Sequence, residues 1–176
     1  MVRRVVTGVG SSGKPVIVSD GEPPVTRQYT HTPGFGRSLV WNTTAPAAPS
    51  DDPTASLTSY VPARGETIAL TVTFPPATVY ADPAWDPAAA GAEQLEATPG
   101  LAELFEPDNP GMHTIPTVDY GVVLSGEVVL DFDGGETAVL RPGDLVVQNG
   151  TRHAWRNTTA EPATVFFVLI GAGGTS

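Results

Sequence analysis

Apolar and polar residues alternate along several short stretches of this chain, most clearly between Thr67 and Phe74. There isoleucine, leucine, valine and phenylalanine alternate with threonine and alanine, as expected for a strand that buries one face. Further short strands are predicted in the C-terminal half at 119–124, 127–132, 137–140, 145–148, 153–157 and 165–170. Short strands at regular spacing with turn residues between them predict an all-β antiparallel barrel or sandwich.

The N-terminal third contains weaker strand patterns, at residues 3–7, 15–19 and 38–42. Pro23 and Pro24 follow the second of these, and we expect regular structure to stop there because proline lacks a backbone N–H donor. Residues 43–58 are rich in proline, alanine and aspartate and predict an irregular surface loop. His31 lies in a Thr-His-Thr-Pro context, either as a lid residue or ligand or as a loop histidine that binds nothing.

Residues 82–110 interrupt the β pattern with alanine- and glutamate-rich sequence. Helices are predicted at 88–97 and 101–105, separated by Pro99 and Gly100. This insertion is either a lid over the barrel mouth or a helical spacer on the exterior. The expected organisation is a single domain, 1–176, with N-terminal strands and loop at 1–58, barrel strands at 59–81 and 111–172, and the helical insertion at 82–110.

Composition excludes several classes of function. The chain has no cysteine, so it can form neither a disulfide nor a zinc–thiolate site, and this fits a cytoplasmic protein. The formal net charge is -10 at pH 7, which disfavours binding to a phosphate backbone. We therefore expect no nucleic-acid partner. No apolar run is long enough to cross a membrane, so we expect no membrane partner either.

Two of the three histidines lie between Gly111 and Asn157, in a stretch with paired turns. His113 is followed by Asp119 and then by Gly126, whereas Ile115 stands two positions after His113. This spacing resembles the first motif of the cupin superfamily, in which a second histidine would occupy the place of Ile115. The second cupin motif is matched, with glutamine in place of proline, by Gln148, Gly150, His153 and Asn157. The resemblance implies a jelly-roll (cupin) β-barrel with extra N-terminal strands and a short helical insertion before the first motif.

Strand periodicity predicts which of these side chains share a face. His153 and Trp155 point the same way, and Trp155 lines the pocket if His153 faces the interior. Asp119 stands on the same face as Gly121, whereas Tyr120 points the other way, into packing. The expected interior thus collects His113, His153, Asp119, Gln148 and Trp155, with Ile115 in the place of a ligand.

The predicted cluster leaves two alternatives for its chemistry. By analogy with cupins, His113, Asp119 and His153 would bind a divalent transition metal, iron, manganese, nickel or zinc, and leave open positions for substrate. The other alternative is a metal-free pocket in which these same three residues do acid–base work or hold a ligand. Gln148, Trp155 and Ile115 are the predicted substrate-binding residues.

Two functions follow from the resemblance and the predicted pocket. The first is an enzyme, a lyase, isomerase or oxygenase acting on a small organic acid or polyketide-like molecule. The second is a non-catalytic cupin that binds a small-molecule ligand. Because many cupins pair through additional N-terminal strands, the resemblance also implies a homodimer.

Overall fold

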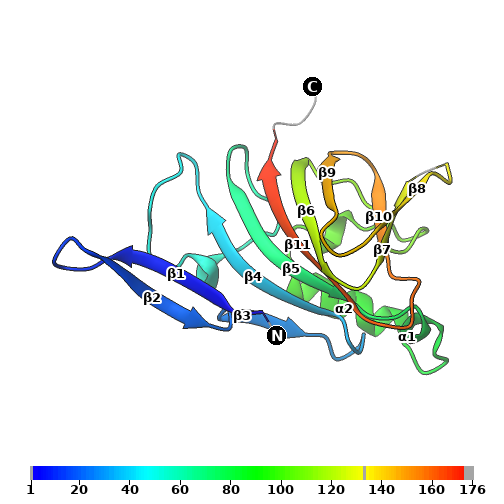
Figure 1. Cartoon of the computed structure of the whole chain (residues 1–176). Helices are drawn as coiled ribbons and strands as arrows, with labels where there is room; N and C mark the ends of the chain where they lie inside the picture. Colours follow the sequence, from blue (N-terminus) through cyan, green and yellow to red (C-terminus); the bar gives the residue numbers. More distant parts are fainter. Residues whose placement is uncertain (1, 133, 173–176) are drawn as a thin grey trace.

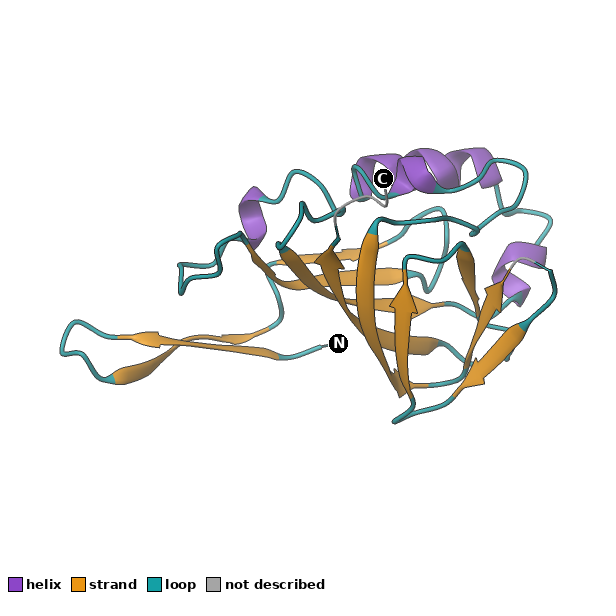
Figure 2. Cartoon of the chain, turned by 90° about the horizontal axis from the view of Figure 1, so that it is seen from above, coloured by secondary structure: helices purple, strands orange, loops and turns teal. Residues whose placement is uncertain are grey.

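The computed structural model describes residues 2–132 and 134–172, and its regular structure consists mainly of antiparallel strands (Figure 1). The larger sheet has the order β3 (Val25–Gln28), β4 (Gly36–Thr43), β5 (Thr67–Phe74), β11 (Ala163–Gly171), β6 (Thr117–Ser125) and β9 (Leu145–Asn149). The smaller sheet has the order β10 (His153–Arg156), β7 (Val128–Phe132) and β8 (Thr137–Leu140). The two sheets enclose the barrel (Figure 2).

The inner face of the larger sheet follows from its register. Buried residues recur at every second position on β5, β11 and β6. The register places these buried residues opposite one another, so they form rows across the barrel interior. One row joins Ile68, Leu169, Asp119 and Gln148. Another joins Arg37, Val72, Val165 and Val123. Polar side chains thus occupy inner-face positions in a barrel that is otherwise mostly apolar.

The short helices lie outside the two sheets. They are α1 (Thr78–Ala81) and α2 (Pro87–Ala97), with 3-10 turns at Thr54–Ser56 and Ala102–Leu104. Asp86 caps α2 by accepting hydrogen bonds from two backbone N–H groups, and Pro87 fits the first helical position. Figure 2 shows α2 running along one side of the barrel. No helix in the described part of the chain is both long and apolar enough to span a membrane.

A separate hairpin, β1 (Arg4–Val9) and β2 (Pro15–Gly21), projects away from the barrel (Figures 1 and 2). Arg4 anchors its base, because the guanidinium donates to the Val40 carbonyl and pairs with Asp52. Beyond this anchor the hairpin exposes apolar side chains, namely Val5, Val9, Val16, Ile17 and Val18. Its strands therefore have no hydrophobic partner within the described chain.

The prediction of an all-β antiparallel barrel is confirmed, because the regular structure is mostly β, with two short helices, in antiparallel sheets. Regular structure stops at the proline pair as predicted, because β2 ends at Gly21, but β3, which begins at Val25, was not expected. This strand forms the sheet edge, where preceding prolines remove no ladder hydrogen bond.

Three further predictions about local structure differ from the structure. Residues 101–105 contain a 3-10 turn rather than an α-helix, and α1 begins within the range 59–81 that was expected to hold barrel strands. Tyr120 was expected in packing, but it is 53% exposed on the outer face of β6. Pairing with edge strand β9 leaves that face open, and alternation alone does not show whether a second layer covers it.

Candidate functional site

His113 and His153 face each other across an isolated bridge in the barrel wall. Each backbone N–H donates to the other residue's carbonyl at 2.9 Å, so the two residues are direct antiparallel partners. Side chains of such a pair lie on the same face. Their ring centroids are 4.4 Å apart, and His153 is only 1% exposed. The fold thus brings together two imidazoles that are distant in sequence.

The hydrogen bonds of these rings set their tautomers. His113 Nδ1 lies 3.1 Å from the Gly111 carbonyl oxygen, and His153 Nδ1 lies 2.9 Å from that of Thr151. A carbonyl oxygen only accepts, so each Nδ1 carries the proton and each Nε2 keeps a lone pair. Burial lowers the pKa of both rings, that of His153 to about 4 with a further contribution from His113. Both imidazoles are therefore neutral proton acceptors at pH 7.

Asp119 is the carboxylate of the interior, on β6 between Leu169 and Gln148. It is 5% exposed, and its Oδ1 has no hydrogen-bond partner among the described residues. Burial raises the pKa of Asp119 to about 6, and the neighbouring Thr117 hydroxyl opposes this effect. The group is thus mainly ionised at pH 7 but takes up a proton close to neutrality.

Gln148 holds the local structure around His153. Its Nε2 donates to the Thr151 carbonyl oxygen at 3.0 Å, and its Oε1 accepts from the Thr151 hydroxyl at 3.0 Å. The same Thr151 carbonyl accepts the Nδ1–H of His153. Gln148 therefore positions the residue that fixes the orientation and tautomer of His153.

Aromatic side chains surround the imidazoles. Trp155 lies 6.1 Å from His153 and 5.1 Å from Phe167, measured between ring centroids. Phe105 contacts His113 at 4.7 Å. It was not singled out in the sequence, because it lies in the insertion predicted to be helical rather than in either motif. Apolar walls of this kind keep water from the polar groups and strengthen their electrostatic interactions.

The donor set fits a metal ion only in part. An imidazole whose Nδ1–H is held by a carbonyl and whose Nε2 is free has the orientation of a metal ligand. Across residues 2–132 and 134–172, however, no three His, Cys, Asp or Glu side chains gather closely enough to hold a metal ion. His113, Asp119 and His153 thus do not form one coordination shell. Ile115, in the place of the missing histidine, is buried in the apolar core instead.

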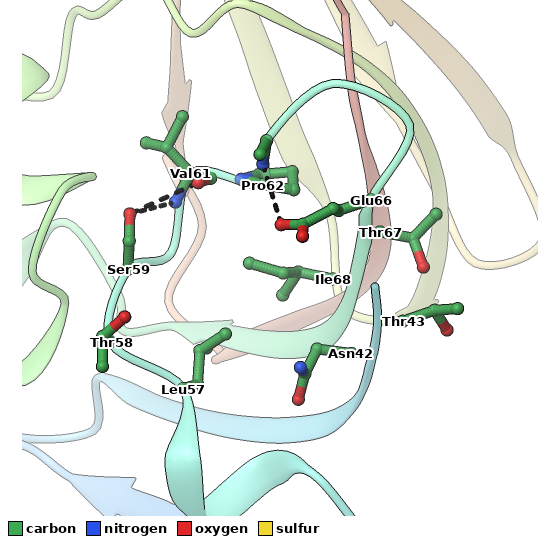
Figure 3. Close-up of a pocket in the computed structure, with 11 residues that line it drawn as sticks. Asn42, Thr43, Leu57, Thr58, Ser59, Val61, Pro62, Glu66, Thr67 and Ile68 are labelled. Carbon is green, nitrogen blue, oxygen red and sulfur yellow. Dashed lines mark hydrogen bonds between the residues drawn. The ribbon is translucent and has the colours of Figure 1, made fainter. Parts of the chain in front are cut away.

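Among the cavities of the described residues, two lie near the barrel that are not lined by His113, Asp119 or His153. The first, of about 210 Å³, lies at the rim beside β5 and is lined by residues such as Asn42, Ser59 and Glu66 (Figure 3). The second, of about 470 Å³, lies beside β3 and the end of α2. It is lined by Pro24, Val25, Thr26, Arg27, Tyr29, Arg37, Tyr60, Glu96 and Ala97.

Helix α2 is tied to the loop between β3 and β4. Glu93 accepts hydrogen bonds from the backbone N–H groups of Thr30 and His31, at 2.9 and 2.8 Å. The side chain of His31 itself is exposed. These bonds hold the end of α2 beside the second cavity, where Glu96 and Ala97 form part of the wall. The predicted insertion thus contributes to a cavity wall.

Comparison with known proteins places the motif-bearing region in a family. The family model described as Cupin_2, cupin domain, matches residues 104–169. Phomopsin biosynthesis cluster protein D of Diaporthe leptostromiformis is 50% identical over 60 residues, which are 33% of this chain and 32% of that protein. Oryzines biosynthesis cluster protein J of Aspergillus oryzae is 41% identical over 64 residues, 36% of each chain.

A cupin-domain-containing oxidoreductase of Aspergillus ruber is 40% identical over 62 residues, 34% of this chain and 30% of that protein. The matched segment spans about a third of the length of these curated relatives. Among solved structures, a double-stranded β-helix protein from Klebsiella pneumoniae has a TM-score of 0.46 and 15% identity, covering 85% of each chain. Residues 104–169, which contain the paired histidines, Asp119 and Gln148, thus match the Cupin_2 domain of the cupin superfamily, and the predicted cupin β-barrel agrees with this match.

Proposed function

We propose that the chain is an enzyme that transfers protons on a small organic molecule in the biosynthesis of a specialised metabolite. The observation that carries the proposal is the burial of three proton acceptors in the barrel, the Asp119 carboxylate and the Nε2 atoms of the paired His113 and His153. Such groups are unfavourable inside an apolar barrel unless they are used or paired. The names of the relatives, several from fungal biosynthesis clusters, support the pathway class.

The chemistry follows from the protonation states. The Asp119 carboxylate would remove a proton from a carbon next to a carbonyl group, which leaves an enolate on the substrate. The same proton would return to another carbon in an isomerisation, or a leaving group would depart in an elimination. The aromatic walls formed by Phe105 and Trp155 would exclude water, and Gln148 would keep His153 oriented through Thr151.

Deuterium exchange tests this proposal without knowledge of the natural substrate. We expect the protein in D2O to exchange the α-hydrogens of at least one 3-oxo acid or 2-aryl acid from a panel, observed by NMR. Asp119→Asn should lower the exchange rate about 100-fold or more, the usual contribution of a positioned general base. His31→Ala, an exposed histidine, is the matched control and should exchange like the wild type.

Binding of panel compounds without any exchange would instead indicate the non-catalytic alternative, a cupin that only recognises a small molecule. Exchange that is equal in the wild type and in Asp119→Asn would exclude Asp119 as the base. Both outcomes would overturn the proposal in its present form.

A metal-dependent oxidoreductase is the second candidate, favoured by the names of several relatives and by the free Nε2 atoms of His113 and His153. A bound divalent ion would supply Lewis acidity towards a carbonyl oxygen of the substrate. Elemental analysis of the purified protein decides between the candidates. Near-stoichiometric iron, manganese, nickel or zinc that is lost in His113→Ala and His153→Ala would favour the metal enzyme.

We also propose that the protein forms a homodimer through the β1–β2 hairpin. This hairpin exposes five β-branched apolar side chains and has no partner sheet within the described chain. The apolar area would be covered by a second copy in a symmetric exchange of hairpins.

Deletion of residues 1–21 should convert the dimer to a monomer while the barrel stays folded. Light scattering coupled to size exclusion measures the mass, and circular dichroism checks the barrel. A full-length protein that is monomeric at all concentrations, or a truncated protein that still dimerises, would contradict this assignment.

A further inference from the structure

Arg37 is a buried cation in the barrel whose role the motifs do not explain. It lies on β4 opposite Val72, in the same inner-face row as Val165 and Val123. Its residue exposure is 7%, and its Nε and Nη1 atoms have no hydrogen-bond partner among the described residues. A guanidinium carries five N–H donors and is always charged in proteins. Within the described chain, Arg37 therefore lacks hydrogen-bond acceptors for two of its buried nitrogen atoms.

No carboxylate of the described residues lies within ion-pair distance of Arg37. Its guanidinium lies over the rings of Tyr60 and Phe35, with the central carbon 5.5 and 5.9 Å from the ring centroids. The titratable groups that affect the pKa of Arg37 are the phenols of Tyr29 and Tyr60, which raise it against the larger effect of burial. By contrast, each of these arginines has a carboxylate within ion-pair distance: Arg3, Arg4, Arg27, Arg141, Arg152 and Arg156.

An unpaired buried charge is strongly unfavourable, and π contacts offset only part of that cost. Burial lowers the pKa of Arg37, yet arginine keeps its proton in proteins. An anion from outside the chain would therefore neutralise this buried charge and lower its cost. The Nε and Nη1 donors of Arg37, which have no partner among the described residues, can each donate to a carboxylate oxygen.

The second cavity gives such an anion access to Arg37. Its volume of about 470 Å³ is in the range of small-molecule pockets, and Tyr29 and Tyr60 share its wall with Arg37. The one carboxylate among its lining residues, Glu96, is exposed and paired with Arg27 at 3.2 Å. That pair leaves Arg37 as the unpaired cation of this cavity.

Arg37 also faces the same interior as the histidine pair. The pKa of His113 is lowered first by burial, but the positive charge of Arg37 contributes to the decrease. A molecule held at Arg37 would therefore lie against the same inner face of the larger sheet that carries Asp119.

We propose that Arg37 binds the carboxylate of the substrate, and that the substrate is a small organic acid with an apolar body. The carboxylate accepts from the guanidinium, and the apolar body packs against the aromatic rings of the cavity. This inference rests on the proposed function and specifies its substrate class. Arg37 acts here as a specificity-determining residue, since it discriminates an acid from its neutral analogue.

Calorimetric titration with hexanoate and with hexanamide tests this inference, because the two ligands share a body and differ in charge. The wild type should bind hexanoate at least about 30-fold more tightly than hexanamide, as expected for a buried charge-assisted contact. Arg37→Met should abolish that preference while the melting temperature without ligand stays equal or rises, because an unpaired charge has been removed. Arg141→Met, at an exposed arginine, should keep the wild-type preference.

The inference fails if the wild type does not distinguish the two ligands, or if Arg37→Met binds hexanoate as tightly as the wild type. It also fails if Arg37→Met lowers the melting temperature without changing the preference, since the arginine would then be structural. None of these readouts involves turnover. Loss of exchange in Asp119→Asn together with unchanged binding in Arg37→Met would overturn this inference alone, whereas the reverse pattern would overturn the proposed reaction alone.

Discussion

Gly126→Val is expected to prevent the barrel from folding. Gly126 has φ of 70°, a left-handed conformation that a β-branched residue adopts only with strain. A Cβ atom there would lie 2.5 Å from the Pro162 carbonyl oxygen and 2.6 Å from the Ala163 Cα. Both are backbone atoms at the start of β11, the central strand between β5 and β6. Strain and clash together should cost more than about 4 kcal/mol, a large fraction of the stability of a single domain.

Chemical denaturation followed by tryptophan fluorescence measures this effect. The matched control is Gly143→Val, since Gly143 also has positive φ, 91°, but no atom lies within 4 Å of its added Cβ. That variant should lose only about 1–3 kcal/mol, the cost of backbone strain alone. Equal losses in both variants would show that the contact with β11 contributes nothing.

The barrel could be predicted because its strands carry local signals. The alternation in 67–74 and the turn glycines follow from strand periodicity and backbone sterics alone, and both were located correctly. Strand β3 was missed because its two preceding prolines suggested a break, and only its place at the sheet edge makes them harmless. Edge position depends on the order of strands in space, which no local pattern contains.

The sequence predicted which residues belong to the candidate site better than it predicted how they are arranged in space. The histidines and Asp119 were identified by motif spacing, but the direct pairing of His113 with His153 depends on one isolated bridge between distant segments. Arg37 gave no signal, because an arginine between glycine and serine suggests a solvent-facing position. The β-bulge between Leu39 and Trp41 changes the register of β4, and with it the side-chain alternation along the strand. The sequence pattern alone therefore did not indicate which face of β4 is buried.

Asp119→Asn is expected to stabilise the protein at pH 7 while it lowers the exchange rate about 100-fold or more. Burial raises the pKa of this carboxyl to about 6 from 3.8, so the folded state binds a proton that the unfolded state releases between these values. The contribution of the Asp119 carboxyl to the free energy of unfolding therefore falls as the pH rises from about 4 to about 6, and the loss is complete above that range. Two pKa units correspond to roughly 3 kcal/mol. Asparagine has nearly the same shape and no charge, so it should recover much of this energy.

The difference in unfolding free energy between Asp119→Asn and the wild type, measured by urea denaturation from pH 4 to 8, isolates the carboxyl. It should be near zero at pH 4 and reach a plateau of about 1–3 kcal/mol above pH 6. His113 and His153, whose pKa values are lowered, act in the opposite direction, because the unfolded state takes up their protons on acidification. Their effect is common to both proteins and cancels in the difference. A difference that does not change with pH would mean that Asp119 is not desolvated in solution, and the barrel interior would then be open to water at the proposed site.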